Sequence, residues 1–300
     1  SGASKLLNSS VLTLDSGAAL STTSGNLIIK TARFVNNAGA SALSVTGGGY
    51  WQVWSSNTSP FSGGTQDTVG SLPANYIQYG ATYGTSTVLG TGNGLLYTYQ
   101  PTLTAALTGT VSKQYDSTTS ASVANSNVSF TGGLNSETAY TYTSTGAAYA
   151  DANVGTSKAV TASGMQFVSA TNAAGQTIYG YSLASIASGN IGTISPATLT
   201  YTANSSTSTY GTTPSVNSGT VTGFVNSDTQ ANATTGTLLF STGATATSNV
   251  GNYSVTGSGL TANNGNYVFA QASGNSTALT VNPATLTYTA NSSTSTYGTT

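Results

Sequence analysis

The chain has 300 residues, of which only 4% are charged, and its formal net charge at pH 7 is −1. Average globular proteins have about 25% charged residues, so solubility must come from the hydroxyl and amide groups of Ser, Thr and Asn. The absence of His and Cys excludes disulfides, thiolate nucleophiles and metal sites of the Cys or His type. Five basic residues are too few to neutralise a phosphate backbone, and no apolar run reaches 18 residues. We therefore expect no nucleic-acid partner, no membrane span in these residues and no cofactor.

The first 100 residues carry short apolar segments at fairly even spacing. These segments lie at residues 12–14, 27–29 and 43–45, and Gly, Ser and Asn separate them. Evenly spaced short strands with one or two inward residues are typical of the rungs of a parallel β-helix. The pattern predicts that residues 1–100 are the C-terminal end of a β-helical shaft.

An aromatic cluster, Tyr50, Trp51 and Trp54, interrupts this rhythm. These rings could form a platform on which a sugar stacks. They could instead form a hydrophobic cap that closes the β-helix, because an open end would leave an unpaired sheet edge and an exposed core. The sequence favours the cap and keeps the carbohydrate platform as the alternative.

A long internal repeat fills the rest of the chain. Residues 196–213 recur letter for letter at residues 283–300, and a weaker copy begins at Pro101. A fixed period near ninety residues indicates an array of similar domains. We expect β domains at residues 101–195 and 196–282, with residues 283–300 starting another and the array continuing beyond this fragment. Strand-like alternation, as at Leu199 and Tyr201, leaves a β-sandwich and a β-grasp-like module both open.

Several positions recur between the two repeats and serve as landmarks. They pair by spacing as Tyr115 with Tyr210, Asp116 with Gly211, and Val154 with Val250. The two tyrosines could belong to a binding loop. Their position after a turn favours a structural role, in which each ring packs against the repeat core.

The acidic residues do not form a pattern that supports catalysis. Asp15 and Asp67 are the only acids in the first 100 residues, and they are far apart in sequence. Glycoside hydrolysis, the chemistry that a β-helix often supports, normally needs two carboxylates that flank the scissile bond. No acid lies near Pro101, Pro196 or Pro283, where calcium would bind at domain boundaries. We expect no enzyme activity, no catalytic residue and no metal site.

Several motifs resemble known bacterial exoproteins. The stretches ARFVNNAGASALSVTGGGYWQVWSS, NYIQYGATYG and LGTGNGLLYT resemble the end of the shaft in exoproteins of the filamentous haemagglutinin type, which leave Gram-negative bacteria by two-partner secretion. KQYDSTTSASV resembles the YDG repeat, although Ser117 replaces its glycine. TYGTTPSV, GFVNSDT, NVGNYSV and NNGNYVF resemble the MBG repeat of the YGX type.

The resemblance implies a non-enzymatic structural segment of a secreted bacterial surface adhesin, acting as a stalk or as a multivalent adhesion array. The alternative is a subunit of a self-assembling extracellular or biofilm-matrix fibre that grows by β-strand addition. The implied partners are glycans or proteins on host or neighbouring cells, or further copies of the chain. An outer-membrane transporter would act during secretion, and the implied location is the bacterial cell surface or the secreted matrix.

Overall fold

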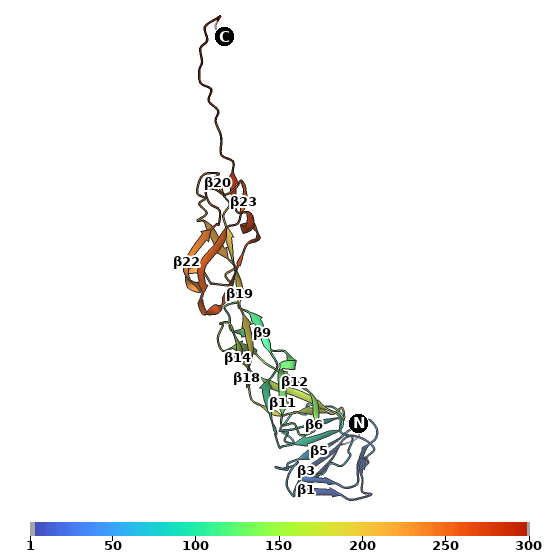
Figure 1. Cartoon of the computed structure of the whole chain (residues 1–300). Helices are drawn as coiled ribbons and strands as arrows, with labels where there is room; N and C mark the ends of the chain where they lie inside the picture. Colours follow the sequence, from blue (N-terminus) through green and yellow to red (C-terminus); the bar gives the residue numbers. More distant parts are fainter. Residues whose placement is uncertain (1–3, 299–300) are drawn as a thin grey trace. The chain divides into compact units, whose positions relative to one another are not determined.

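The computed structural model describes residues 4–298, and these are nearly all β (Figure 1). The strands of the N-terminal part are β1 (Lys5–Leu14), β2 (Leu20–Thr22), β3 (Leu27–Asn36), β4 (Leu43–Val45), β5 (Trp51–Ser55), β6 (Tyr76–Gln78) and β7 (Gly94–Tyr97). The next strands are β8 (Thr102–Leu107), β9 (Val111–Gln114), β10 (Ser120–Ala121), β11 (Val128–Thr131), β12 (Glu137–Thr143), β13 (Gly146–Tyr149), β14 (Gly155–Ser163), β15 (Gln166–Asn172), β16 (Thr177–Tyr179), β17 (Ser182–Leu183) and β18 (Ile186–Ser195).

The last strands are β19 (Ala197–Ala203), β20 (Ser206–Thr209), β21 (Gly219–Thr222), β22 (Thr234–Ser241), β23 (Gly251–Tyr253), β24 (Thr256–Ala262), β25 (Tyr267–Gln271) and β26 (Leu279–Asn282). The helical elements of the described residues are all short: α1 (Gln230–Ala233), η1 (Asn125–Asn127), η2 (Asn263–Gly265) and η3 (Ser273–Thr277).

The chain folds into two compact units. Unit 1 comprises the described residues up to Val111 together with Ser120–Ala150 and Ser157–Gly192. Unit 2 comprises Ser112–Thr119, Asp151–Thr156 and the described residues from Thr193 onward. Unit 2 therefore contains three segments from the first predicted repeat, the last of them only residues 193–195, as well as the whole second repeat.

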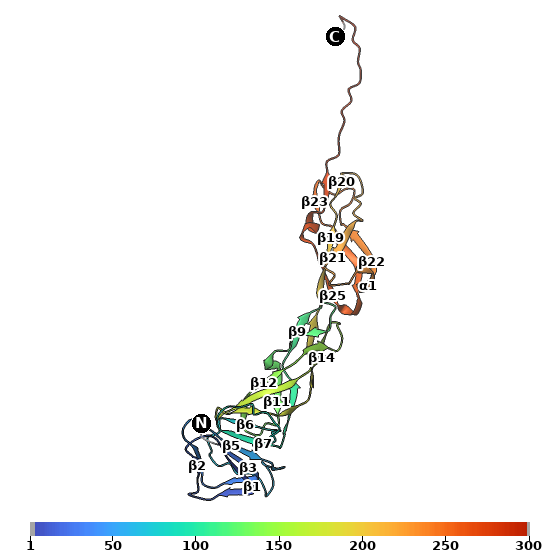
Figure 2. The same cartoon turned by 180° about the vertical axis from the view of Figure 1, so that it is seen from behind.

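A sheet of eight strands organises unit 1, in the order β1-β3-β5-β7-β6-β16-β15-β12. The strands from β1 to β16 are parallel to their neighbours, and β15 and β12 complete the sheet with antiparallel pairs. Figure 2 shows β5, β7 and β6 beside one another. Strand β6 pairs with β16 through Ile77 and Ile178, so the sheet runs from the first hundred residues into the first repeat.

A second parallel pair, β2 with β4, accompanies this sheet, with Leu20 opposite Leu43. Parallel pairing of short strands agrees with the periodicity at residues 12–45. The described residues nevertheless form several mixed sheets, and no β-helical solenoid is identified among them. The shaft end stays a prediction, whereas the all-β class is confirmed.

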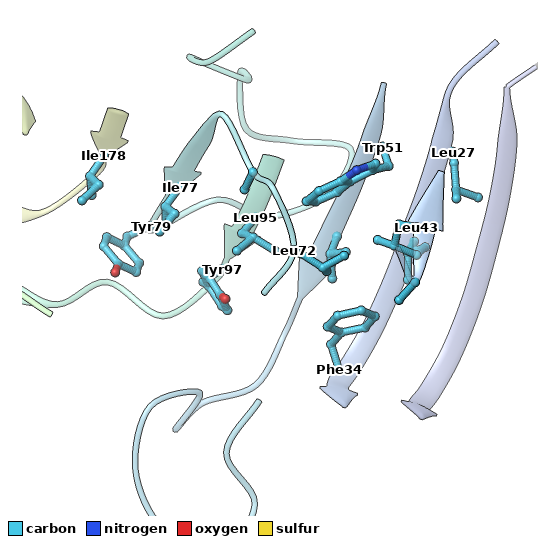
Figure 3. Close-up of a cluster of buried hydrophobic side chains, with 14 of the residues drawn as sticks. Leu27, Phe34, Leu43, Trp51, Leu72, Ile77, Tyr79, Leu95, Tyr97 and Ile178 are labelled. Carbon is cyan, nitrogen blue, oxygen red and sulfur yellow. The ribbon is translucent and has the colours of Figure 1, made fainter. Parts of the chain in front are cut away.

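One continuous hydrophobic core lies beneath the large sheet. Figure 3 shows its side chains from Leu27 and Phe34 through Trp51 to Tyr79 and Ile178. All five are at most 4% exposed. Strand alternation explains this core, because every second side chain of a strand faces the same side of the sheet.

The two repeats share one pattern of strand pairing. In the first repeat, β8 pairs antiparallel with β11 and parallel with β17. In the second, β19 pairs antiparallel with β21 and parallel with β25. Each repeat adds a long antiparallel pair, β12 with β15 and β22 with β24. The opening leucines are buried alike, since Leu103 and Leu199 are both 0% exposed.

The duplicated segment offers a matched pair of substitutions. Leu199 is fully buried, whereas Leu286, at the same position of the identical sequence, is 81% exposed. We expect Leu199→Ala to destabilise unit 2 by about 2–5 kcal/mol, because it removes buried methyl groups and leaves a cavity. Leu286→Ala should change stability by less than about 0.5 kcal/mol. Urea unfolding monitored by tyrosine fluorescence measures both, and equal effects would contradict the assigned core.

Candidate functional site

The two tryptophans of strand β5 lie on opposite faces of the large sheet. Trp51 is 2% exposed within the main core, and Trp54 is 5% exposed in a separate cluster with Tyr76 and Leu96. Residues three apart in a strand face opposite sides, so the two rings do not share one surface. Tyr50 is half-buried. The sugar platform stays a prediction that the burial of these rings does not support.

Strand β5 also does not end the sheet, since it pairs with β3 on one side and with β7 on the other. Trp51 is therefore a core residue in the middle of the sheet. The cap predicted for this cluster stays a prediction as well.

The landmark Asp116 belongs to a small polar turn. Its Oδ1 accepts a hydrogen bond from Lys113 Nζ at 2.7 Å and another from the Thr118 backbone N–H at 2.9 Å. Burial acts to raise the pKa of Asp116, but the hydrogen bonds from Lys113 and Thr118 outweigh it, and the pKa is lowered. The next residue, Ser117, has φ of 60°, which is the conformation that a glycine would adopt freely.

The landmark Tyr115 meets the second repeat within unit 2. Its hydroxyl donates to Asp228 Oδ2 at 3.0 Å, and the hydroxyl of Tyr267 donates to the same oxygen at 2.7 Å. The two rings meet edge to face with centroids 5.3 Å apart. Asn226 donates from Nδ2 to the backbone carbonyl of Asp116. We call Tyr115, Tyr267, Asp228 and Asn226 joint 2.

A second set of contacts reinforces joint 2. The backbone N–H of Val154 donates to Asn266 Oδ1 at 2.9 Å, and Asn266 Nδ2 donates to Asn153 Oδ1 at 3.0 Å. Asn266 is only 6% exposed, so these bonds satisfy an amide that would otherwise be buried without partners. The landmark Val154 therefore contributes its backbone to the joint.

A related arrangement of two tyrosines, an acid and an asparagine occurs inside unit 1. Tyr181 donates its hydroxyl to Glu137 Oε1, and its ring meets Tyr79 with centroids 5.0 Å apart. Asn135 donates from Nδ2 to the hydroxyl of Tyr79. We call Tyr79, Tyr181, Glu137 and Asn135 joint 1. Tyr79 precedes the first repeat in the chain, as Tyr115 precedes the second.

Both joints use the same loop, with the pattern Thr-Gly-x-x-Asn-Ser-acid. It reads TGGLNSE at residues 131–137 and TGFVNSD at residues 222–228. In each loop the backbone N–H before the Asn donates to the tyrosine oxygen, from Leu134 to Tyr181 at 2.8 Å and from Val225 to Tyr267 at 3.0 Å. The loop thus presents the acid and an N–H group to one tyrosine.

The glycine of this loop is required by a close backbone approach. Gly132 has φ of 93° and Gly223 has φ of 106°. A Cβ at these positions would lie 2.7 Å from the Thr102 carbonyl oxygen and 2.4 Å from the Thr198 carbonyl oxygen, respectively. Only glycine fits both the conformation and the contact.

The electrostatics of joint 1 favour a neutral phenol that donates to an ionised carboxylate. Burial raises the pKa of Tyr79 to about 12, and burial followed by the hydrogen bond to Glu137 raises the pKa of Tyr181. Burial acts to raise the pKa of Glu137 too, but the hydrogen bonds from Tyr181 and Asn135 outweigh it, and the pKa is lowered. Hydrogen bonds to a charged acceptor are stronger than neutral ones.

The phenols of joint 2 are neutral donors as well. Burial raises the pKa of Tyr267 to about 12, and it raises the pKa of Tyr115. Both hydroxyls therefore stay protonated donors at neutral pH. These joints are suited to holding modules together, because their polar groups are already hydrogen-bonded to one another.

The landmarks of the second repeat are exposed. Tyr210 is 47% exposed and Val250 is 54% exposed, whereas Tyr115 is 8% exposed. Gly211 has φ of 92°, with no atom near the position of a Cβ. The structure therefore brings Tyr115, Asp116 and Val154 to a joint, and leaves Tyr210, Gly211 and Val250 on the surface.

Sequence reasoning missed Tyr79, Tyr181, Glu137, Asp228 and Tyr267 as members of these joints. Two patterns in the sequence could have indicated the joints. The first is the pair of related loops TGGLNSE and TGFVNSD, and the second is the Tyr-Gly step at Tyr79, which resembles the Tyr-Asp and Tyr-Gly steps of the two repeats. Among residues 4–298 there is no group of three or more acidic side chains that could hold a metal ion. No helix of the described residues is long and apolar enough to cross a membrane.

Glu137 makes the stability of unit 1 depend on pH. Its pKa is lowered in the folded state, so its contribution is present above the ordinary carboxyl pKa of about 4.3 and is lost as the pH falls through the folded value. We expect the melting temperature of unit 1 to fall below about pH 4. Glu137→Gln should lower the melting temperature at pH 7, and it should weaken the decrease of the melting temperature at acidic pH. If the melting temperature of the variant decreased at acidic pH as much as that of the original chain, this role of Glu137 would be contradicted.

Tyr115 and Tyr210 provide a matched test of joint 2. Tyr115→Phe removes a buried hydrogen bond to a carboxylate, and we expect unit 2 to lose about 1.5–3 kcal/mol of stability. Tyr210→Phe alters an exposed side chain and should change stability by less than about 0.5 kcal/mol. Chemical denaturation of both variants in the full chain measures the difference, and equal values would refute the joint.

Comparison with known proteins gives two family matches. Residues 98–188 match the model of the YDG domain, and residues 199–277 match the model of the MBG domain (YGX type). The search of curated proteins and the search of solved structures found no match. Domains of these two kinds are typical repeat domains of bacterial surface proteins. Joint 2 lies where one domain meets the next, and the chain thus carries a YDG domain followed by an MBG domain of the YGX type.

Proposed function

We propose that this chain is a non-enzymatic structural segment of a secreted bacterial surface adhesin of the filamentous haemagglutinin type, exported by two-partner secretion. Its role would be that of a stalk or of a multivalent adhesion array. The observation that carries the proposal is the recurrence of the tyrosine–carboxylate joint, once inside each unit. A joint built twice from the same loop suits modules that follow one another in series.

The way in which the scarce charges are used supports this role. The described carboxylates of Glu137 and Asp228 accept hydrogen bonds from tyrosines of the joints. The chain has six acidic residues, of which these two hold joints, and it has no His, so it offers few groups for acid–base chemistry. Adhesion would then come from many weak contacts summed by multivalency, with glycans or proteins on host or neighbouring cells as partners.

The parallel strands near the N-terminus support a shaft in the same proposal. Strands β1, β3, β5 and β7 pair in parallel, and β2 pairs with β4 in parallel. Two parallel stacks in one segment are what the end of a β-helical shaft would contribute. Secretion would then need an outer-membrane transporter, and the chain would reside on the cell surface or in the secreted matrix.

A second candidate function is that of a subunit of a self-assembling extracellular or biofilm-matrix fibre. Among the described residues, strand β1 lies at one edge of the eight-stranded sheet, and it exposes Leu6 (56%) and Val11 (50%). Lys5 is the only charge of this strand, so charge gives little protection against pairing with another copy. This edge favours growth by β-strand addition.

Electron microscopy of the material shed from producing cells separates the two candidates. We expect the micrographs to show isolated rods. We also expect brief protease treatment of intact cells to remove the protein from them. Regular fibrils would support the second candidate, and Val11→Lys should then abolish them, because a charge opposes edge pairing. Thr13→Lys, at an exposed position of the same strand that is already polar, is the matched control for added charge. Protein found only inside intact cells would overturn both.

A further inference from the structure

Unit 2 carries an exposed tyrosine, Tyr210, whose position in the fold matches that of Tyr115. Tyr210 occupies in the MBG domain the place that Tyr115 occupies in the YDG domain. The backbone N–H of Tyr115 donates to the Ser195 carbonyl at 2.8 Å, and that of Tyr210 donates to the Asn282 carbonyl at 2.9 Å. Each tyrosine thus follows a short strand that is held to the last strand of its domain.

The surroundings of the two tyrosines differ in one respect. Tyr115 is covered by Tyr267 and Asp228 of the following domain, and it is 8% exposed. Tyr210 is 47% exposed, and Val250, which precedes the next strand but one of the same sheet, is 54% exposed. We call Tyr210, Gly211, Asn249 and Val250 the Tyr210 face. It presents a phenol hydroxyl and the same Asn-Val step that joint 2 uses at Asn153 and Val154.

We propose that the Tyr210 face docks a further MBG-type module, whose equivalents of Asp228, Tyr267 and Asn266 form a third joint. This inference rests on the proposed role of the chain as a series of modules. The carboxylate of the docked module would accept the Tyr210 hydroxyl, and its buried asparagine would pair with Asn249 and the Val250 backbone.

The occupant is indicated by the residues that follow the MBG domain. Residues 283–300 repeat residues 196–213 letter for letter, so another MBG opening strand begins directly after Asn282. Pro196 follows Ser195 in the same way, and that linkage leads into joint 2. An MBG-type opening therefore follows the hydrogen-bond partner of Tyr210 in the chain, just as Pro196 follows the partner of Tyr115.

The copied strand also has side chains suited to a core. Leu199 and Tyr201 are 0% and 3% exposed inside the MBG domain. Their counterparts Leu286 and Tyr288 are 81% and 95% exposed. Leucine and tyrosine side chains that alternate as on a buried strand face are stabilised when a folded module buries them, so this segment is suited to be the first strand of a further module.

An extended chain tests the proposal. A second copy of residues 214–282 is added after Thr300, which completes an MBG module that starts at Pro283 and is identical to the first. Tyr297→Phe is introduced into both the original and the extended chain, so that the peptides spanning residues 196–213 and 283–300 differ in mass. Nitration of tyrosines by tetranitromethane, read by mass spectrometry, then reports Tyr210 and Tyr288 separately.

We expect the nitration rate of Tyr210 to fall about sixfold in the extended chain, in proportion to a change from 47% to 8% exposure. Tyr288 should become protected as the added module folds, and Tyr115 should stay protected in both chains. Protection of Tyr288 without protection of Tyr210 would overturn the proposal. An added module that leaves Tyr288 reactive would overturn it too, since the same sequence folds beside joint 2.

A matched pair of variants in the added copy distinguishes docking from simple crowding. Replacing the counterpart of Asp228 by Ala should restore the nitration of Tyr210. Replacing the adjacent counterpart of Ser227, which is exposed, by Ala should leave Tyr210 protected. Because nitration reads only the joint, these outcomes do not depend on whether the chain reaches the cell surface. Failure of the adhesin proposal would instead appear in microscopy and protease treatment of cells.

Discussion

The hydrogen bond from a buried tyrosine to a carboxylate is the interaction on which the arrangement of successive modules depends. A tyrosine ring supplies a large apolar surface, but its hydroxyl must find a partner when it is buried. In a chain with 4% charged residues, Glu137 and Asp228 supply that partner at the same place in successive domains. In joint 1 the pKa of Glu137 is lowered and that of Tyr181 is raised, so a neutral phenol donates to an ionised carboxylate and the hydrogen bond is strengthened.

The loop around each acid explains why a short pattern suffices. Gly132 and Gly223 let the backbone approach the first strand of their own domain more closely than a side chain would allow. The Asn of the pattern then reaches back, from Asn135 to the Tyr79 hydroxyl and from Asn226 to the Asp116 carbonyl. One loop therefore ties its domain both to its own core and to the segment before it, in a chain that has no cysteine for a disulfide.

The sequence predicted the elements whose cause is local. Alternation placed Leu199 and Tyr201 on a buried face, and the repeat placed Tyr115 and Tyr210 at equivalent positions. It did not predict the pairing of β6 with β16, because Ile77 and Ile178 are brought together by the fold across about a hundred residues. Nor did it predict the opposite faces of Trp51 and Trp54, although their spacing in a strand implies them once the strand is known. Predicting the joints would have required relating two distant loops to four tyrosines, and no single local pattern contains all of these residues.

The two joints differ in the number of tyrosine hydroxyls that donate to the acid. In joint 1 the work is divided, since Tyr181 donates to Glu137 while the Tyr79 hydroxyl accepts from Asn135. In joint 2 both tyrosine hydroxyls donate to a single oxygen of Asp228. Loss of that carboxylate would leave two buried hydroxyls without an acceptor, and each carries a desolvation cost of about 1–3 kcal/mol. Asp228 is the only charged residue between Pro196 and Asn282. The side chain of Asp228 is therefore the acceptor for both phenols in a stretch that otherwise contains no charged residue.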